Sequence, residues 1–348
     1  MDMLRRSLLV VLLVLMCYSV TSAQEAAAPS TAAAMAKAAT AFLASLDDAQ
    51  RNRAKMAFDD PRRLDWHNIP KPARKGVSLG DLSAAQRDQG MAILQAALSE
   101  EGFEKAKNIL ALENNLREGE KGLANGHLRD PLRYYFTVFG EPGGQGAWGW
   151  SFEGHHLSLN FVVHDGGVVS DTPSFWGANP ATVKLFVEGG PQAGERTLAD
   201  EEQLAFELLG ALDAEQRAVA IVANEAPKDY RSPGAPQLPP TAPAGLPAAR
   251  MNAAQKQILT DLLTEYCGHL APELAAARLK ELEDAGLDEI HFAWRGAARP
   301  GVGHAYCIQG PTALLELVNV QSDPAGNPAN HIHSVWRNPR GDFGVKLK

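Results

Sequence analysis

The segments Arg133-Tyr134-Tyr135-Phe136-Thr137-Val138-Phe139-Gly140 and Glu289-Ile290-His291-Phe292-Ala293-Trp294-Arg295-Gly296 decide the fold class. Each places aromatic and β-branched residues at alternate positions and ends on a glycine, which is typical of a strand that leads into a turn. Two more strand-like segments follow each of them, at residues 150–154 and 156–162 and at residues 306–310 and 312–318. We therefore expect antiparallel strands in both parts of the chain.

Amphipathic helices are predicted ahead of both groups of strands. Residues 46–54 resemble residues 212–220, and residues 82–87 resemble residues 251–256. The matched elements keep their order at a separation of roughly 160 residues, too long for a solenoid repeat. The sequence thus predicts an α+β protein of two related halves, each an amphipathic helix pair followed by antiparallel strands, packed about an approximate twofold axis. Chance similarity of short Ala- and Gln-rich helices is the alternative.

The predicted segments follow from these patterns and from the distribution of proline. They are a signal peptide at 1–23, a flexible Ala-rich leader or frayed first helix at 24–41, a first α+β half at 42–226, a Pro-rich linker at 227–250 and a second α+β half at 251–348. The first helix of the second half, at about 208–224, precedes the linker. Neither a helix nor a central strand is expected to run through the linker, because proline lacks the backbone N–H that both need.

The N-terminus predicts export. Arg5 and Arg6 precede an apolar run that ends at Met16, and Thr21-Ser22-Ala23 provides a small-residue ending, as in a secretory signal peptide. This run is shorter than the ~20 residues needed to cross a bilayer, and no later stretch is both long and uncharged enough. We therefore expect a periplasmic or extracellular protein without stable membrane insertion.

Charge and cysteine content narrow the class of protein further. The formal net charge is −8, and no clustered Lys/Arg surface is apparent, which argues against nucleic acid as a partner. Beyond the signal peptide the chain carries Cys267 and Cys307. They either form one disulfide or remain two buried thiols.

Two groups of histidines are the best candidates for a functional site. In an extended segment, His331 and His333 point to the same side, because side chains repeat every second residue. His155 and His156 are adjacent, so we expect one of them to enter the same pocket and the other to support it. Together the four histidines predict a site for a divalent transition metal, Zn²⁺, Cu²⁺ or iron. The alternative is that these histidines only satisfy hydrogen bonds.

Acidic, basic and aromatic residues near these motifs are candidates for catalysis and substrate binding. Glu153 or Glu316 would be the general base, and Arg337 would orient an anionic substrate. Trp150 and Trp336 would line a cleft able to stack on a sugar or peptide, although large aromatics on strands are more often core residues. The turn formers around Arg337 favour a structural turn as the alternative.

Several of these motifs together resemble a known family. The residues are Trp148-Gly149-Trp150, Glu153-Gly154-His155-His156-Leu157-Ser158-Leu159-Asn160, Ile308-Gln309-Gly310-Pro311-Thr312, Asn330-His331-Ile332-His333-Ser334-Val335-Trp336-Arg337 and Gly341-Asp342-Phe343-Gly344. This combination is similar to the family called domain of unknown function 3500, from about Phe42 to Gly344. The resemblance implies an exported protein of about this length and no particular reaction.

These observations lead to one leading functional hypothesis and two rivals. The first is an exported metal-dependent enzyme, hydrolytic or oxidative, with a histidine cluster at the junction of the halves and a small-molecule, peptide or glycan ligand. The second is a periplasmic or extracellular protein that binds a metal or ligand without turnover. The third is a purely structural protein.

Overall fold

The computed structural model describes residues 30–124 and 126–345, which form eight α-helices and thirteen strands. All of these strands belong to one sheet, in which most neighbours are antiparallel. The prediction of an α+β protein is confirmed, and both groups of antiparallel strands form where they were expected.

The elements follow one another in two sets. The first set is α1 (Thr31–Ser45), α2 (Asp48–Ala54), β1 (Lys55–Met56), β2 (Val77–Ser78), α3 (Ala84–Ala97), α4 (Glu100–Gly119), β3 (Tyr135–Phe139), β4 (Ala147–Glu153), β5 (Leu157–His164), β6 (Gly167–Ser170) and β7 (Ser174–Ala178). The second set is α5 (Ala199–Ala211), α6 (Ala214–Ala220), β8 (Ile221–Ala223), β9 (Leu246–Pro247), α7 (Ala253–Gly268), α8 (Pro272–Ala285), β10 (His291–Gly296), β11 (His304–Gln309), β12 (Leu314–Asn319) and β13 (Ile332–Arg337).

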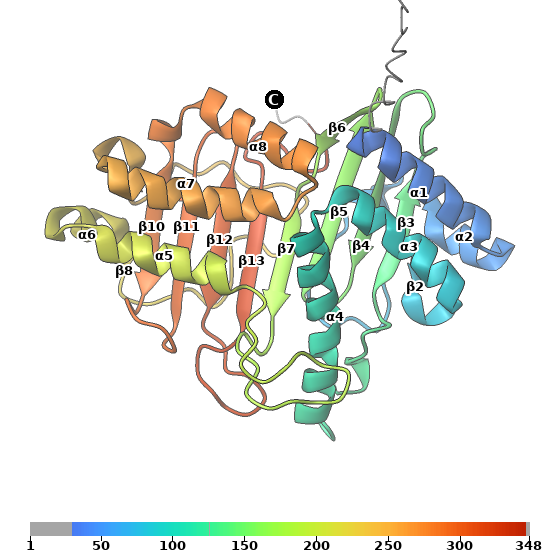
Figure 1. Cartoon of the computed structure of the whole chain (residues 1–348), viewed down its shortest axis with the longest axis horizontal. Coiled ribbons are helices and arrows are strands. Elements are labelled where there is room, and N and C mark those ends of the chain that lie inside the picture. The colour runs from blue at the N-terminus through green and yellow to red at the C-terminus, as the bar shows by residue number, and fades with distance from the viewer. Residues whose placement is uncertain (1–29, 125, 346–348) are drawn as a thin grey trace, which may run out of the picture.

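The sheet order places the two sets side by side (Figure 1). It runs β1-β3-β4-β5-β7-β13-β12-β11-β10-β8, so β7 and β13 join the sets at the centre. Outward from this pair, the strands on one side are β7, β5, β4, β3 and β1, and the corresponding strands on the other side are β13, β12, β11, β10 and β8. The short strands β2 and β9 pair with β3 and β10, which also correspond. This order is compatible with the predicted twofold arrangement, and the twofold relation itself stays a prediction.

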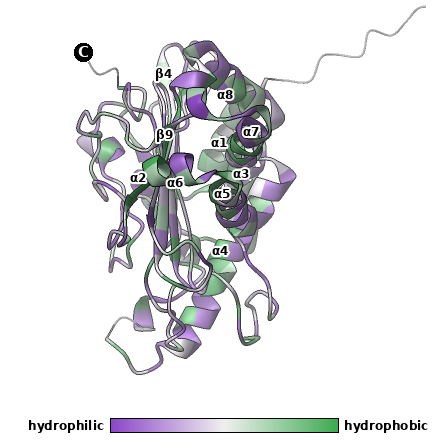
Figure 2. Ribbon diagram, turned by 90° about the vertical axis from the view of Figure 1, so that its left-hand side faces the viewer, coloured by the Kyte–Doolittle hydropathy of each residue, from purple (hydrophilic) through white to green (hydrophobic). Residues whose placement is uncertain are grey.

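The long helices cover one face of the sheet and irregular segments cover the other (Figure 2). Successive strand residues point to opposite faces, which divides the core. On β7, Trp176 belongs to the large cluster under the helices, whereas Phe175 joins a second cluster with Trp66, Tyr230 and Val335. The segments on this second face include the Pro-rich stretch, in which Tyr230 and Leu238 are buried.

The Ala-rich stretch differs from the flexible leader that was expected. From Thr31 on it is helix α1, in which Met35, Ala39 and Phe42 are fully buried. Alanine has the highest helix propensity, and its small side chain lets α1 pack closely. The frayed-helix alternative was therefore nearer to the structure. The signal-peptide prediction and residues 24–29 lie outside the described residues.

A second difference concerns the helix predicted at about 208–224. It is interrupted: α5 ends at Ala211, α6 begins at Ala214, and β8 follows from Ile221. Asp213 is extended and its side chain accepts a hydrogen bond from Gln216 N, while the Gln216 side chain caps the Asp213 N–H. This capping box starts a new helix instead of continuing the old one.

Two further expectations concern cysteines and membranes. Cys267 on α7 and Cys307 on β11 are buried free thiols, so no disulfide joins them. Among the described residues, none of the helices has the length and apolar character that a membrane crossing requires.

Candidate metal centre

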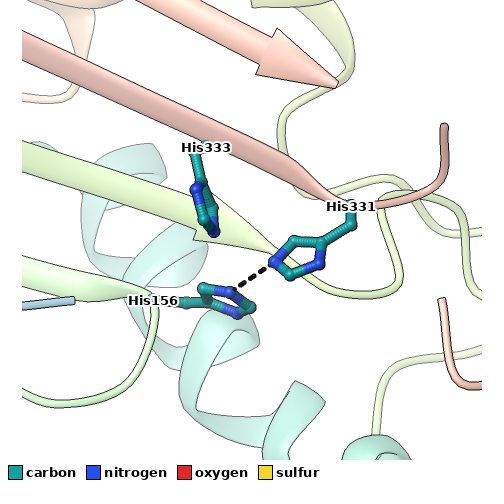
Figure 3. Close-up of side chains that lie close together, drawn as sticks. All are labelled: His156, His331 and His333. Atoms are coloured by element: carbon teal, nitrogen blue, oxygen red, sulfur yellow. Dashed lines mark hydrogen bonds between the residues drawn. The ribbon is translucent and has the colours of Figure 1, made fainter. Parts of the chain in front are cut away.

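Three histidines meet where the two sets of strands join (Figure 3). His156 lies in the turn between β4 and β5, His333 is on β13, and His331 immediately precedes that strand. The register of β13 on β7 places His333 opposite Gly177. The central strand pair therefore brings residues 175 positions apart in the chain into one cluster.

The backbone of His156 is held in an unusual conformation. Its φ is +64°, in the left-handed region, which costs a residue with a Cβ about 1–2 kcal/mol. Two hydrogen bonds fix it: His156 N–H donates to Asn68 O over 3.0 Å, and Gly177 N–H donates to His156 O over 2.7 Å. Non-glycine residues in such conformations cluster at functional sites.

Two glycines make room for the His155-His156 turn. A Cβ on Gly154 would lie 2.3 Å from the Tyr134 ring, and one on Gly177 would lie 3.0 Å from His156 Cδ2. The Tyr134 hydroxyl in turn donates a hydrogen bond to His155 O. Both positions therefore require glycine, because neighbouring atoms leave no room for a side chain.

The three rings converge closely enough to share one ion. One nitrogen of each of His156, His331 and His333 lies within 4.8 Å of the other two. His156 Nε2 and His331 Nε2 are 2.8 Å apart. Ligand nitrogens on a tetrahedral zinc are about 3.4 Å apart, so an ion would fit after these two rings separate by about half an ångström.

Hydrogen bonds fix the direction in which two of the rings present their lone pairs. His333 Nδ1 lies 2.8 Å from Asp229 Oδ1. Because a carboxylate only accepts hydrogen bonds, Nδ1 carries the proton and Nε2 keeps the lone pair. A carboxylate behind a histidine is the usual support for a metal ligand.

Asn179 supports His331 in a similar way. Asn179 Nδ2 lies 3.2 Å from His331 Nδ1. The other amide atom, Asn179 Oδ1, is buried without a hydrogen-bond partner. The two amide atoms are nearly indistinguishable by shape. Turning the amide by 180° lets Oδ1 accept from Nδ1–H, which removes the orphaned acceptor and leaves His331 Nε2 free to bind a metal.

The electrostatics of the cluster favour neutral imidazoles. Burial lowers the pKa of His156 well below its usual range, and the neighbouring histidines lower it further. Burial also lowers the pKa of His331 to about 2, with a further contribution from His333. Neutral imidazole is the form that coordinates metals, so these rings are ready to bind an ion at neutral pH.

His155 joins a second polar group beside the first. Its ring centroid is 3.6 Å from that of His156, and its Nδ1 lies 2.5 Å from Glu113 Oε1 on α4. Arg129 Nη1 is 2.9 and 3.0 Å from the two ring nitrogens, and Glu120 binds the rest of that guanidinium.

Protonation of the Glu113–His155 pair follows from its burial. Burial raises the pKa of Glu113 to about 8, against the opposing charge of Arg129. Burial lowers the pKa of His155 well below its usual range. The proton therefore resides on Glu113 and is donated to His155. A cavity of about 10 Å³ lined by both residues and Tyr134 has room for about one water molecule.

The structure keeps the predicted general bases apart from the histidines. Glu153 is buried at the end of β4, with Lys75 Nζ at 2.8 Å and Arg74 Nη1 at 3.9 Å. Glu316 accepts hydrogen bonds from the backbone N–H and Nε of Arg231, at 3.1 and 2.8 Å. Each carboxylate is thus matched by its own cation.

The predicted substrate contacts are also engaged elsewhere. Arg337 is fully buried and donates to Asp342 Oδ2 over 2.6 Å and to Ala235 O over 2.9 Å. Trp150 stacks on Phe161 under the helices, with ring centroids 4.6 Å apart. Trp336 follows the alternation of β13 and packs on the helix-covered face, away from the side of His333. None of the three contacts the histidine cluster.

Another group of potential ligands is occupied by a lysine. Glu201, Glu265 and His269 offer atoms within 4.8 Å of one another. Lys105 Nζ lies 3.0 Å from Glu201 Oε1 and 3.1 Å from His269 Nε2, and it also contacts Glu265. An ammonium group already neutralises these carboxylates, which indicates an ionic network between α4, α5 and α7.

Sequence reasoning missed Glu113, Asp229 and Asn179. Glu113 had a detectable signal, because it lies on the buried stripe of α4 that includes Leu112 and Leu116, where a carboxylate is rare. Asp229 and Asn179 lie in loops, and only the tertiary structure brings them behind the histidines.

The fold and the cluster define a mixed α+β protein with a three-histidine group that could hold a metal ion. The chain belongs to the family described as "Protein of unknown function (DUF3500)", whose model matches residues 28–345. No curated protein and no solved structure matches the chain.

Proposed function

We propose that the protein is an exported metal-dependent enzyme in which His156, His331 and His333 hold a divalent transition metal. The observation that carries the proposal is the convergence of three imidazoles, two of them oriented from behind by Asp229 and Asn179. Three protein ligands leave at least one coordination position open, which is typical of catalytic sites as opposed to closed structural ones.

The ligand set narrows the metal to those that prefer imidazole, namely zinc, copper or iron. When bound, such an ion polarises a water molecule and lowers its pKa to about 7. We favour hydrolysis over oxidation, because such a water is a nucleophile and a buried proton donor lies beside the cluster.

That proton donor is Glu113 acting through His155. Glu113, His155 and His156 offer atoms within 4.8 Å of one another, whereas Glu153 and Glu316 are matched by other cations. In this proposal Glu113, which carries a proton at neutral pH, acts through His155 as the general acid that protonates the leaving group. The substrate is a small molecule, peptide or glycan.

A binding protein without turnover is the second candidate. Burial supports it, since His156 is 2% exposed and His333 is 7% exposed. A nearly enclosed ion would be retained well and exchanged slowly.

Elemental analysis of protein prepared without a histidine tag tests the metal. We expect about one equivalent of zinc, copper or iron per chain, falling below a tenth in His331→Ala and His333→Ala. His164→Ala is the matched control, because the His164 side chain is 53% exposed on β5 and lies outside the cluster. Less than a tenth of an equivalent in the unmodified protein, even after reloading, would contradict the proposal.

Turnover then separates the two candidates. Hydrolysis of an ester, peptide or glycoside panel that stops on chelation and returns on reloading supports the enzyme. Saturable metal binding without turnover of any class supports the binding protein.

We also infer export and an origin of the two sets of elements by duplication. The pattern of Arg5, Arg6 and the apolar run supports the first inference. The mirrored strand order about β7 and β13 supports the second.

A further inference from the structure

A pocket of about 600 Å³ lies outside the histidine cluster, within the usual range of about 300–1,000 Å³ for small-molecule sites. It lies between the loop after β7, the first turns of α5, the β10–β11 loop, the end of β12 and the loop before β13. The lining residues used below are Lys184, Arg196, Glu202, Gln203, Phe206, Asn319, Asn327 and Asn330.

Two residues that line the pocket, Asn319 and Asn330, connect it to the metal centre, although none of the three histidines lines it. Asn330 lines the pocket and immediately precedes His331 in the chain. Asn319 Oδ1 accepts a hydrogen bond from His331 N–H over 3.1 Å, and Asn319 Nδ2 donates to Glu202 Oε1 over 2.7 Å. Hydrogen bonds thus connect the lining of the pocket to the backbone of His331, which is a proposed metal ligand.

The charge of the pocket favours an anionic ligand. Glu202 is already matched, because Arg196 Nη2 lies 2.5 Å from its Oε2 and Asn319 Nδ2 donates to its Oε1. Arg196 is 32% exposed and uses one N–H group on Glu202, so further donors of its fork remain available. Lys184 lines the pocket and is exposed. A planar carboxylate matches the guanidinium fork.

The amide groups of the pocket favour hydroxyl groups on the same ligand. Gln203 Nε2 donates to Glu207 and Asn327 Nδ2 donates to Asp323, at 2.9 and 2.8 Å. Within the described part of the chain, no hydrogen bond reaches the carbonyl oxygens of these two amides, which are acceptors suited to O–H donors. The partly buried ring of Phe206 supplies an apolar wall.

We propose that this pocket, next to the metal centre, binds small hydroxylated carboxylates, the chemical class of the sugar acids. Lys184 and Arg196 bind the carboxylate, and Gln203 and Asn327 accept from the hydroxyl groups. The link to catalysis rests on the proposed function, whereas the binding specificity is a property of the pocket alone.

Calorimetric titration of the metal-free protein tests the specificity with galacturonate as the probe. We expect a Kd on the order of 1 mM, at least about tenfold weaker binding of galactose, and weaker binding of acetate and inorganic phosphate. Lys184→Gln should raise the Kd for galacturonate about fivefold to tenfold, as expected for a lost charge-assisted hydrogen bond. Lys121→Gln, at an exposed site outside the pocket, should leave it unchanged.

Three results would overturn the specificity. They are no saturable binding of galacturonate, equal affinity for galactose or for acetate, and an unchanged Kd in Lys184→Gln. Lys184 is exposed, so its substitution leaves the fold intact and the variant remains informative. Arg196→Gln gives a second test, with circular dichroism to confirm folding, because Arg196 also pairs with Glu202.

Proximity to the metal centre has its own measurement. In protein loaded with Co²⁺, the proton resonances of bound galacturonate should broaden beyond those in the Zn²⁺-loaded protein. Absence of extra broadening would refute the link between pocket and centre. A protein that binds galacturonate but takes up no metal, even after reloading, would refute the proposed function and leave the pocket specificity standing, so the two failures are distinguishable.

Discussion

Gly177 and His156 share a space that leaves no room for a methyl group. A Cβ on Gly177 would lie 3.0 Å from His156 Cδ2 and 3.1 Å from Ile332 O. Gly177→Ala should therefore push the His156 ring away from its partners and weaken metal binding about tenfold to a hundredfold. The overpacking should also lower the free energy of unfolding by about 1–2 kcal/mol.

Competition with a chromophoric chelator measures the metal affinity of this variant, and thermal unfolding measures its stability. Gly167→Ala is the matched control, because Gly167 is also on a strand and its nearest contact, His164 O, would lie 3.8 Å from the new Cβ. An affinity for metal equal to that of the unmodified protein would show that His156 is not a ligand.

Asp229 lies in the irregular segments that cover the second face of the sheet, and it contacts the histidine cluster. Its carboxylate accepts from His333 Nδ1–H over 2.8 Å, which holds the ring in place and keeps the lone pair on Nε2. Asp229→Ala should weaken metal binding about tenfold to a hundredfold, and Asp229→Asn, which keeps an acceptor without the charge, should weaken it less. The same chelator competition gives both values. Asp288→Ala is the control, because the Asp288 side chain is exposed. Equal losses of metal affinity in all three variants would contradict a role for the hydrogen bond between Asp229 and His333.

At the scale of elements, local patterns predicted the strands well and helix boundaries less well. Alternating aromatic residues located β3 and β10, because one strand residue in two must face a core. The break at Asp213 was missed, although the same Asp-x-x-Gln capping box starts α2 at Asp47. A capping box marks a helix start even inside an apparently continuous amphipathic stretch.

Local sequence patterns predicted the candidate site less completely than they predicted the helices and strands. The spacing of His331 and His333 was sufficient to place both rings on one side of an extended segment. Their approach to His156 depends on the β7–β13 pairing, which involves residues far apart in the chain. A short motif does not determine which loops pack beside it in the folded chain. Asp229 and Asn179 therefore could not be found from the sequence. The roles predicted for Glu153 and Arg337 depended on partners that only packing reveals.

At the scale of the whole molecule, the two sets of helices are joined by the ionic network around Lys105. Lys105 on α4 belongs to the first set, whereas Glu201 on α5, Glu265 on α7 and His269, which immediately follows α7, belong to the second. A hydrogen bond with His269, and the charge of Lys105, lower the pKa of Glu265 from 4.5 to about 2. Burial alone would lower the pKa of His269, but its hydrogen bonds to Glu201 and Glu265 outweigh burial and raise it.

The signs of these shifts define how stability should depend on pH. A carboxylate whose pKa is lower in the folded state stabilises the fold above its unfolded pKa, and this contribution is lost as the pH falls through the folded value. For Glu265 the loss should extend from about pH 4.5 to about pH 2 and amount to roughly 2–3 kcal/mol. His269 acts in the opposite direction, because its stabilisation is complete below pH 6.5 and is lost as the pH rises through its raised folded pKa.

Glu265→Gln removes the charge but keeps the shape, so it should lower stability near pH 6 and flatten the decline in stability between pH 4.5 and 2. Urea unfolding at a series of pH values measures both effects, and Glu283→Gln, at an exposed position on α8, is the control. Parallel stability curves for Glu265→Gln and the unmodified protein below pH 4.5 would show that Glu265 titrates alike in the folded and unfolded states. In that case Glu201, which also contacts Lys105 and His269, would be the carboxylate that joins the two sets of helices.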